Sequence, residues 1–305
     1  DELVVNKYHL ECRLRGQYRL GNPSLRIYNP SFLFYYEADI ESKSSLVVLP
    51  QIEQIEGIDL STDFPKMYQG AMPIRRIGTS GEFYGIREYF PGDDFKNINW
   101  RVFGRTRKLM VNQFEREDIS DIMFVLDARE ISGTGTILRN PLNYSCRAAA
   151  SLTSFFLRAR NRVGLTIYGE TVDVIPPDTG ERHLYRILTA LAEVKAGGSL
   201  GLHTVLGDLR NFTPRSPVMV LSTLENDPTS TNALREITAR GFKLTVIAPD
   251  TLDYDRESRI ISPTVYFTAS ASLDNKITEA RSLGARAMRW DPENVLSTSL
   301  AEVIR

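Results

Sequence analysis

The feature that most constrains this chain is a regular alternation of apolar strands and amphipathic helices that begins near residue 119. It opens with Ile122–Leu126, an unbroken apolar run typical of a central strand that is buried on both faces of a sheet. Asn140-Pro141 then predicts a helix start, because a capping Asn precedes Pro at the first helical position. Further strand-like runs follow at 163–168, 171–175, 218–221 and 244–247. We therefore predict that residues 119–305 form an α/β domain with a mostly parallel sheet and helices on both faces.

Two local patterns refine this prediction. Gly169-Glu170 separates two strand-like runs by a two-residue turn, which predicts a hairpin and an antiparallel strand at the edge of the sheet. Val265-Tyr266-Phe267 is interpreted as a short strand that precedes a helix with Leu273 and Ile277 on its inner face.

Residues 1–56 show period-two alternation and no helical period, for example at Tyr8–Leu14 and Ser24–Tyr28. Phe32–Tyr36 and Ser45–Leu49 add further strand-like runs. These patterns predict a small all-β segment, an Ig-like antiparallel sandwich or its remnant. Residues 57–118 have no clear period, and we interpret them as a linker that is dense in charged and aromatic side chains.

Composition excludes several classes of function. The net charge is −1, so no overall field attracts the chain to nucleic acid, and no basic stripe with interleaved aromatics is present. Two cysteines and three histidines match no metal-ligand spacing, and we predict neither a metal nor a cofactor. No apolar run approaches the roughly 20 residues that a membrane helix requires.

Candidate binding residues follow two of the predicted strands. In open α/β sheets, ligands bind beyond the carboxyl ends of the strands. Asp127 comes directly after the most apolar strand, and Ser222-Thr223-Leu224-Glu225 follows the 218–221 strand. An acid directly after a buried central strand is well placed to hold a hard cation.

This layout resembles the von Willebrand factor A domain, whose metal site takes an Asp-x-Ser-x-Ser loop, a Thr and a second Asp. Asp127 matches the first Asp, but Arg129 and Ile131 stand at the two Ser positions. Thr223 stands where the last Asp would be, and the Thr position is matched by Thr204 or, as the weaker alternative, Ser199.

The substitutions remove two hydroxyl ligands and one carboxylate, and they place a cation beside Asp127. We therefore interpret the site as a degenerate metal-ion-dependent adhesion site in which Arg129 pairs with Asp127. The candidate partner-binding residues are Asp127, Arg129, Ser199, Thr204 and Thr223.

The most distinctive stretch runs from Gly81 to Glu117. It resembles the signature of the family called domain of unknown function 58, with Asn99 in place of the usual Asp. The matching residues are Arg87, Tyr89, Gly92, Asp93, Ile98, Trp100, Arg105, Leu109, Val111, Glu115 and Glu117. Arg15–Gly21, Asn29-Pro30 and Val47–Pro50 extend the resemblance over nearly the whole chain.

The signature predicts a polar network. Gly92-Asp93-Asp94 is turn chemistry, and Trp100 is expected to bury an apolar face against the α/β domain. Arg87 and Arg105 are candidates for bidentate pairing with Asp93, Asp94, Glu115 or Glu117. The alternatives are a partner-binding surface and a catalytic site built on Arg87, Asp93, Asp94 and Arg105. Carboxylates that converge in an open pocket would favour an enzyme, and carboxylates buried in ion pairs would favour an adaptor.

The family resemblance implies a membrane-tethered protein that works with a MoxR-type AAA+ ATPase in the assembly or maturation of other proteins. The chain opens at Asp1 without an initiator Met, so we expect an N-terminal membrane anchor outside it. This chain would be the soluble, cytoplasmic-side portion, a non-catalytic adaptor that binds the ATPase or a client protein. The alternatives are an uncharacterised enzyme and a metal-dependent adhesion module.

Overall fold

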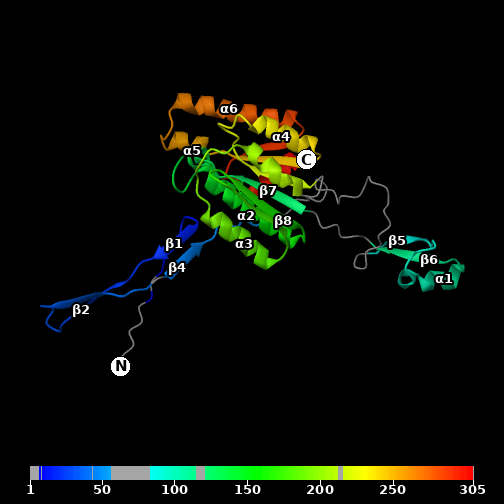
Figure 1. The fold of residues 1–305 in the computed structure, drawn as a ribbon, viewed down its shortest axis with the longest axis horizontal. Helices are drawn as coiled ribbons and strands as arrows, with labels where there is room; N and C mark the ends of the chain where they lie inside the picture. The colour runs from blue at the N-terminus through cyan, green and yellow to red at the C-terminus, as the bar shows by residue number, and fades with distance from the viewer. Residues whose placement is uncertain are drawn as a thin grey trace. The chain divides into compact units, whose positions relative to one another are not determined.

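The computed structural model describes residues 7, 9–42, 44–55, 83–114, 121–211 and 216–304. The chain divides into two compact units, one formed by Asp1–Ile58 with Asp121–Arg305 and the other by Asp59–Ser120. The β segment at the N-terminus therefore belongs to the same unit as the α/β domain. Figure 1 shows the elements of both units.

The α/β domain is built on one six-stranded sheet with the order β12-β11-β10-β7-β8-β9. Its strands are β7 (Asp121–Asp127), β8 (Arg162–Tyr168), β9 (Val172–Asp178), β10 (Pro217–Leu221), β11 (Lys243–Pro249) and β12 (Arg286–Trp290). All neighbouring pairs are parallel except β8 and β9. The predicted mostly parallel sheet with an antiparallel edge strand is confirmed. Read in chain order, the strands follow the doubly wound order 3-2-1-4-5-6.

Helices cover both faces of this sheet. They are α2 (Pro141–Arg158), α3 (Glu181–Glu193), α4 (Ser230–Ala239), α5 (Leu252–Glu257), α6 (Pro263–Ser282) and α7 (Leu296–Ile304), with 3-10 turns η2 (Glu130–Gly133) and η3 (Leu202–Asn211). In Figure 1, α4 and α6 lie on the opposite side of the sheet from α3. Side chains along β7 alternate accordingly, since Met123 and Val125 pack in the core with α4 and α6, while Phe124 contacts Phe156 of α2.

Two helix starts show why one prediction was confirmed and another was wrong. Asn140 caps α2 as predicted, accepting a hydrogen bond of 2.8 Å from the Asn143 N–H. The predicted strand at Val265–Phe267 instead lies inside α6. Ser262 followed by Pro263 is the same kind of start signal, and the Ser262 hydroxyl accepts from the Val265 N–H. Three apolar residues in a row could not distinguish strand from helix.

The N-terminal residues do not form the predicted sandwich in the part that the structure describes. β1 (Gly16–Leu20) pairs with β4 (Ser44–Val48), and β2 (Ser24–Tyr28) pairs with β3 (Tyr35–Asp39), both antiparallel. These are two separate two-stranded sheets. A sandwich needs two sheets with facing apolar sides, whereas every side chain of β2 is exposed. Phe32–Phe34, predicted as part of a strand, forms the turn between β2 and β3, and residues 9–14 contain no strand.

The β1–β4 sheet is fastened to the α/β domain by two arginines. Arg15 Nη1 donates to the carbonyls of Leu191 and Val194 at the end of α3, at 2.6 and 2.8 Å. Arg147 of α2 forms an ion pair of 2.8 Å with Glu53. Long-range polar contacts therefore hold the N-terminal segment to this unit.

The described part of the expected linker has secondary structure of its own. β5 (Phe83–Glu88) pairs antiparallel with β6 (Met110–Phe114), and between them lie η1 (Phe95–Asn97) and α1 (Trp100–Thr106). Ile98 and Val111 are buried between these elements. Across the described ranges of both units, no helix combines the length and apolarity needed to cross a membrane.

Candidate functional site

The candidate site is the edge of the sheet where the parallel strands end. Strand order reverses between β7 and β10, and ligands of open α/β sheets bind at such a switch point. The site is bordered by loops 127–131, 196–201 and 222–230, which we call the rim. The Gly197 N–H donates to the Ala128 carbonyl at 2.8 Å, and the Glu130 N–H donates to the Gly198 carbonyl at 3.0 Å. The backbone therefore fixes two of the rim loops against each other.

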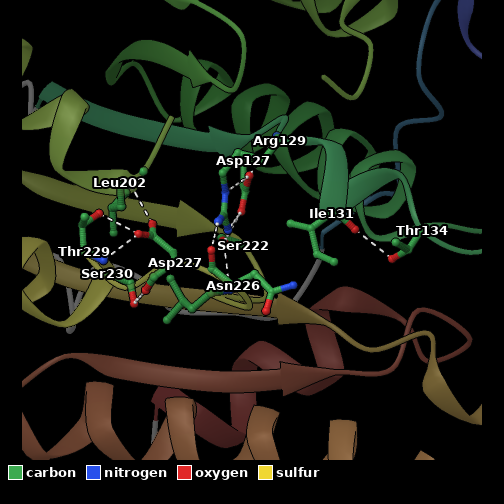
Figure 2. A network of polar contacts seen from close by, with 12 residues as sticks. Asp127, Arg129, Ile131, Thr134, Leu202, Ser222, Asn226, Asp227, Thr229 and Ser230 are labelled. Atoms are coloured by element: carbon green, nitrogen blue, oxygen red, sulfur yellow. Dashed lines mark hydrogen bonds and ion pairs between the residues drawn. The ribbon is translucent and has the colours of Figure 1, made fainter. Parts of the chain in front are cut away.

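At the centre of the rim, Asp127 and Arg129 form a buried ion pair (Figure 2). Arg129 Nη2 donates to Asp127 Oδ2 at 2.6 Å, and Arg129 Nε donates to Oδ1 at 3.0 Å. The backbone N–H of Arg129 also donates to Oδ1 at 3.0 Å. The side chains are 3% and 0% exposed, so water has almost no access to the pair. The pairing predicted for Arg129 and Asp127 is present.

Ser222, the first residue after β10, completes the environment of Asp127. Its hydroxyl donates to Asp127 Oδ2 at 2.6 Å and accepts from the Leu224 N–H at 2.9 Å. Each oxygen of the Asp127 carboxylate thus accepts two hydrogen bonds. Of these four hydrogen bonds, three are donated by Arg129 and one by Ser222. A carboxylate saturated in this way has no remaining lone pair directed at a metal ion.

Arg129 is held equally firmly. Its Nη1 donates to the Asn226 carbonyl at 3.3 Å, and its guanidinium carbon lies 5.9 Å from the centre of the Tyr168 ring. Burial by itself lowers the pKa of Arg129, but the hydrogen bonds and charge of Asp127 outweigh it and raise that pKa. Burial is also the main cause that raises the pKa of the Tyr168 hydroxyl. Arg129 therefore stays charged and supplies a fixed positive charge at the switch point.

The other positions that were compared with the von Willebrand factor A metal site do not complete a ligand shell. Ile131 has no ligand atom in its side chain, and Thr223, which is buried, offers a hydroxyl instead of a carboxylate. In the ranges given above, no group of three or more His, Cys, Asp or Glu side chains is arranged to hold an ion. The donor set around Asp127 therefore does not fit Mg²⁺, and the guanidinium lies where a cation would neutralise this carboxylate.

Asp227 is a structural residue of the rim that the sequence did not reveal. Its carboxylate accepts from the Leu202 N–H at 2.8 Å and from the Thr229 N–H and hydroxyl at 2.8 and 2.6 Å. Burial raises the pKa of Asp227, but these hydrogen bonds outweigh it and lower that pKa overall. A Cβ at Gly201 would lie 2.4 Å from the Thr229 hydroxyl, so glycine is required for this close approach. The sequence feature that could have identified Asp227 is Asp227-Pro228 just before α4, because Asp commonly precedes a helix.

The five predicted partner-binding residues differ in accessibility. Asp127, Arg129 and Thr223 are buried, Thr204 is half-buried with its hydroxyl donating to the Gly201 carbonyl, and Ser199 is exposed. Asp127 and Arg129 are therefore framework residues that a partner does not reach directly. The exposed side chains of the rim are Glu130, Ala196, Ser199, Leu200, Asn226 and Pro228, and His203 of η3 is exposed as well.

The signature region contains a second Arg–Asp pair. Arg87 Nη1 and Nη2 donate to the two oxygens of Asp93, each at 2.7 Å. Asp93 Oδ2 also accepts from the Phe90 N–H at 2.8 Å, closing the turn around Gly92. Hydrogen bonding to Asp93 is the main cause that raises the pKa of Arg87. Asp93 is buried, whereas the Arg87 side chain is 25% exposed.

The remaining signature residues have local roles. Asp94 caps η1 by accepting from the Lys96 N–H at 3.0 Å, and Asn99 caps α1 by accepting from the Val102 N–H at 3.0 Å. The ring of Tyr89 stacks on Phe95 at 6.0 Å between centroids. Trp100 packs edge-on against Phe103 and is largely exposed within its own unit. Its predicted contact with the α/β domain stays a prediction.

The proposed network is thus only partly present in the described residues. Arg87 and Asp93 pair, but Arg105 is exposed on α1 and Asp94 is occupied as a cap. Glu115 and Glu117 lie outside the described residues. Of the four residues of the alternative catalytic site, Arg87 and Asp93 are bonded to each other, and Asp94 is engaged as a helix cap.

Three comparisons with known proteins bear on this arrangement. The family model described as "Protein of unknown function DUF58" matches residues 85–260, more than half of the chain. An uncharacterized protein of Mycobacterium tuberculosis is 27% identical over 171 residues, which are 55% of this chain and 53% of the relative. The uncharacterized protein YeaD of Bacillus subtilis is 21% identical over 189 residues, 62% of this chain and 45% of the relative. The chain spans about half the length of these curated relatives.

Among solved structures, the crystal structure of the conserved hypothetical protein BatB from Bacteroides thetaiotaomicron aligns with a TM-score of 0.41 and 15% identity. The alignment covers 61% of this chain and 97% of that one.

Proposed function

This chain belongs to the DUF58 family of unknown function, and we propose that it is a non-catalytic adaptor that binds other proteins through the rim. In this proposal its α/β domain is von Willebrand factor A-like. The chain is part of a membrane-tethered protein that works with a MoxR-type AAA+ ATPase in the assembly or maturation of other proteins. Its anchor lies outside the chain, and the chain itself faces the cytoplasm.

One observation carries the proposal: the switch point of the sheet is filled by a saturated ion pair. In an enzyme or a metal-dependent module, this position holds groups that are free to engage a substrate or an ion. Here the Asp127 carboxylate accepts four hydrogen bonds and Arg129 is buried beneath the loops. Such a centre fixes the surrounding loops in one conformation, which suits a preformed protein-binding surface.

The mostly parallel sheet with one antiparallel edge strand supports the von Willebrand factor A-like reading. So does the position of Asp127 at the end of the first strand of the sheet in chain order. The exposed rim residues supply a mixed surface: Glu130 is acidic, Asn226 is polar and uncharged, and Leu200 is apolar. A partner contact there would take place above the ion pair and would need no metal ion.

The test is a pull-down with a MoxR-type AAA+ ATPase, the partner that the proposal names, with and without ATP. We expect the wild-type chain to capture the ATPase in at least one nucleotide state, and Glu130→Arg with Asn226→Arg to reduce capture at least about tenfold. The matched control is Glu181→Arg. Glu181 is exposed at the start of α3, which follows the end of β9 beside the beginning of β8, away from the rim.

Two outcomes would contradict the proposal. If the wild-type chain captures no ATPase in either nucleotide state, the partnership is lost. If the rim variant and Glu181→Arg reduce capture equally, the rim is not the binding surface.

A further inference from the structure

The β2–β3 hairpin ends in an apolar apex. Phe32, Leu33 and Phe34 form the turn, and their side chains are 78%, 75% and 74% exposed. The strands behind them also expose large apolar residues on both faces: Leu25, Ile27, Tyr28, Tyr35 and Tyr36. Within the described residues, β2 and β3 pair only with each other. A two-stranded sheet is only marginally stable in water, so we expect the apex to contact an apolar environment when the protein functions.

Polarity changes in order along the hairpin axis. Residues 27–36 contain no charged side chain. The first charges behind the apex are Arg26 and Glu37, which face each other across the strands and form an ion pair of 3.1 Å. Between this pair and the apex lie three tyrosines, Tyr28, Tyr35 and Tyr36. The order is therefore charge, then amphipathic aromatic rings, then the apolar side chains of Phe32–Phe34, which share the turn with the polar Asn29 and Ser31.

Several polar groups of the turn are paired with each other. Asn29 Oδ1 accepts from the Phe34 N–H at 3.1 Å, and Asn29 Nδ2 donates to the Ser31 hydroxyl at 2.9 Å. The Asn29 N–H donates to the Phe34 carbonyl at 3.0 Å, and the Phe32 N–H donates to the Asn29 carbonyl at 2.9 Å. Leaving water normally costs several kcal/mol for each unpaired polar group. These hydrogen bonds remove part of that cost for the turn.

We propose that the apex Phe32–Phe34 inserts into the interfacial region of a phospholipid bilayer, with the three tyrosines at the level of the headgroups. A protein groove would cover one face of the hairpin, whereas a bilayer surrounds the apex on all sides, and both faces are apolar. The apex extends about 10 Å beyond the Arg26–Glu37 pair, taking roughly 3.3 Å for each of three residues. Interfacial segments insert to a comparable depth of about 5–10 Å, and tyrosine is enriched at that boundary.

The driving force in this proposal is apolar burial, since the chain has a net charge of −1 and the apex has no basic cluster. Insertion therefore requires no anionic lipid and is insensitive to salt. The proposal does not depend on the adaptor function and concerns a different surface from the rim.

The test is flotation of the 305-residue chain with phosphatidylcholine vesicles, at low and high salt. We expect the wild-type chain to float at both, and Phe32→Ser/Leu33→Ser/Phe34→Ser to lower the partition coefficient at least about tenfold. The matched control is Val265→Ser/Phe267→Ser, which removes exposed apolar side chains from α6 and should float like the wild type. Circular dichroism and thermal unfolding confirm that each variant is folded.

A second measurement places the apex directly. A tryptophan introduced by Leu33→Trp in a Trp100→Phe background should shift its emission to the blue on adding vesicles, and brominated lipid should quench it. The proposal is overturned if the wild-type chain stays unfloated, if the apex variant floats equally well, or if the emission of the introduced tryptophan does not change. It is also overturned if light scattering shows an apex-dependent dimer while the chain fails to float, since the apex would then bind a second copy.

Discussion

The two units of this protein each contain an Arg–Asp pair with the same chemistry in different surroundings. In the α/β domain, Arg129 and Asp127 are 3% and 0% exposed, and Ser222 shares the carboxylate. In the signature unit, Arg87 is 25% exposed and Asp93 is 5% exposed. Buried pairs are costly to break because the remaining charge has no water, whereas a pair open to solvent contributes little net stability. The same type of ion pair therefore holds the rim together in one unit and closes a turn in the other.

The largest expected effect is that of removing Arg129. Arg129→Ala leaves the Asp127 carboxylate buried without its partner, and we expect a loss of about 3–5 kcal/mol in the free energy of unfolding. Urea unfolding followed by emission of Trp290, which is fully buried in β12, in a Trp100→Phe background measures it. Asp127→Ala/Arg129→Ala should be less destabilised than the sum of the single variants. A loss below about 1 kcal/mol for Arg129→Ala would show that the pair is not buried as described.

Ser222→Ala is the next test. The variant removes the hydroxyl that donates to Asp127 Oδ2 and accepts from the Leu224 N–H, and we expect a loss of about 1.5–3 kcal/mol. Ser199→Ala, at an exposed position of the same rim, should change stability by no more than about 0.5 kcal/mol. Equal effects of the two variants would mean that Ser222 does not support the pair.

In the signature unit the expected effect is smaller. Asp93→Asn weakens the bidentate pair with Arg87, but water replaces part of it, and we expect a local loss of about 1 kcal/mol. Amide exchange at Phe90, whose N–H donates to Asp93, should quicken about fivefold. Asp94→Asn, which alters only the cap of η1, should leave that exchange rate unchanged. A loss as large as that of Arg129→Ala would remove the contrast between the two pairs.

The smallest expected effect is that of Mg²⁺. Because the Asp127 oxygens are saturated, millimolar Mg²⁺ or a chelator should leave the Tm of the wild-type chain unchanged. Arg129→Ser frees two of the four hydrogen-bond positions on Asp127, because the backbone N–H of residue 129 remains, so it is the variant in which a Mg²⁺-dependent rise in Tm is expected to emerge. Calorimetry that shows Mg²⁺ binding to the wild type, abolished by Asp127→Ala, would instead restore the metal-dependent adhesion module.

The sequence predicted the parts of the site whose partners are close along the chain. Arg129 is two residues from Asp127, and Asp93 is six from Arg87, so local geometry sufficed to propose both pairs. It missed Ser222 as the second partner of Asp127, because Ser222 is 95 positions away from it, and considered Thr223 only as the residue at the position of the last metal-binding Asp. Register between β7 and β10 decides which residue after β10 faces Asp127, and no local pattern reports that register.

By itself the sequence determined the order of strands and helices from β7 to β11, the cap at Asn140 and the antiparallel edge strand, because these depend on side-chain period and turn chemistry. It missed β12 and assigned Val265–Phe267 of α6 to a strand. Only the tertiary structure decided that β1 and β4, and β2 and β3, form two separate two-stranded sheets, that Phe32–Phe34 is exposed at an apex, and that Asp227 joins α4 to η3. Alternation shows that a strand has an apolar side, but what covers that side depends on contacts between residues far apart in the chain.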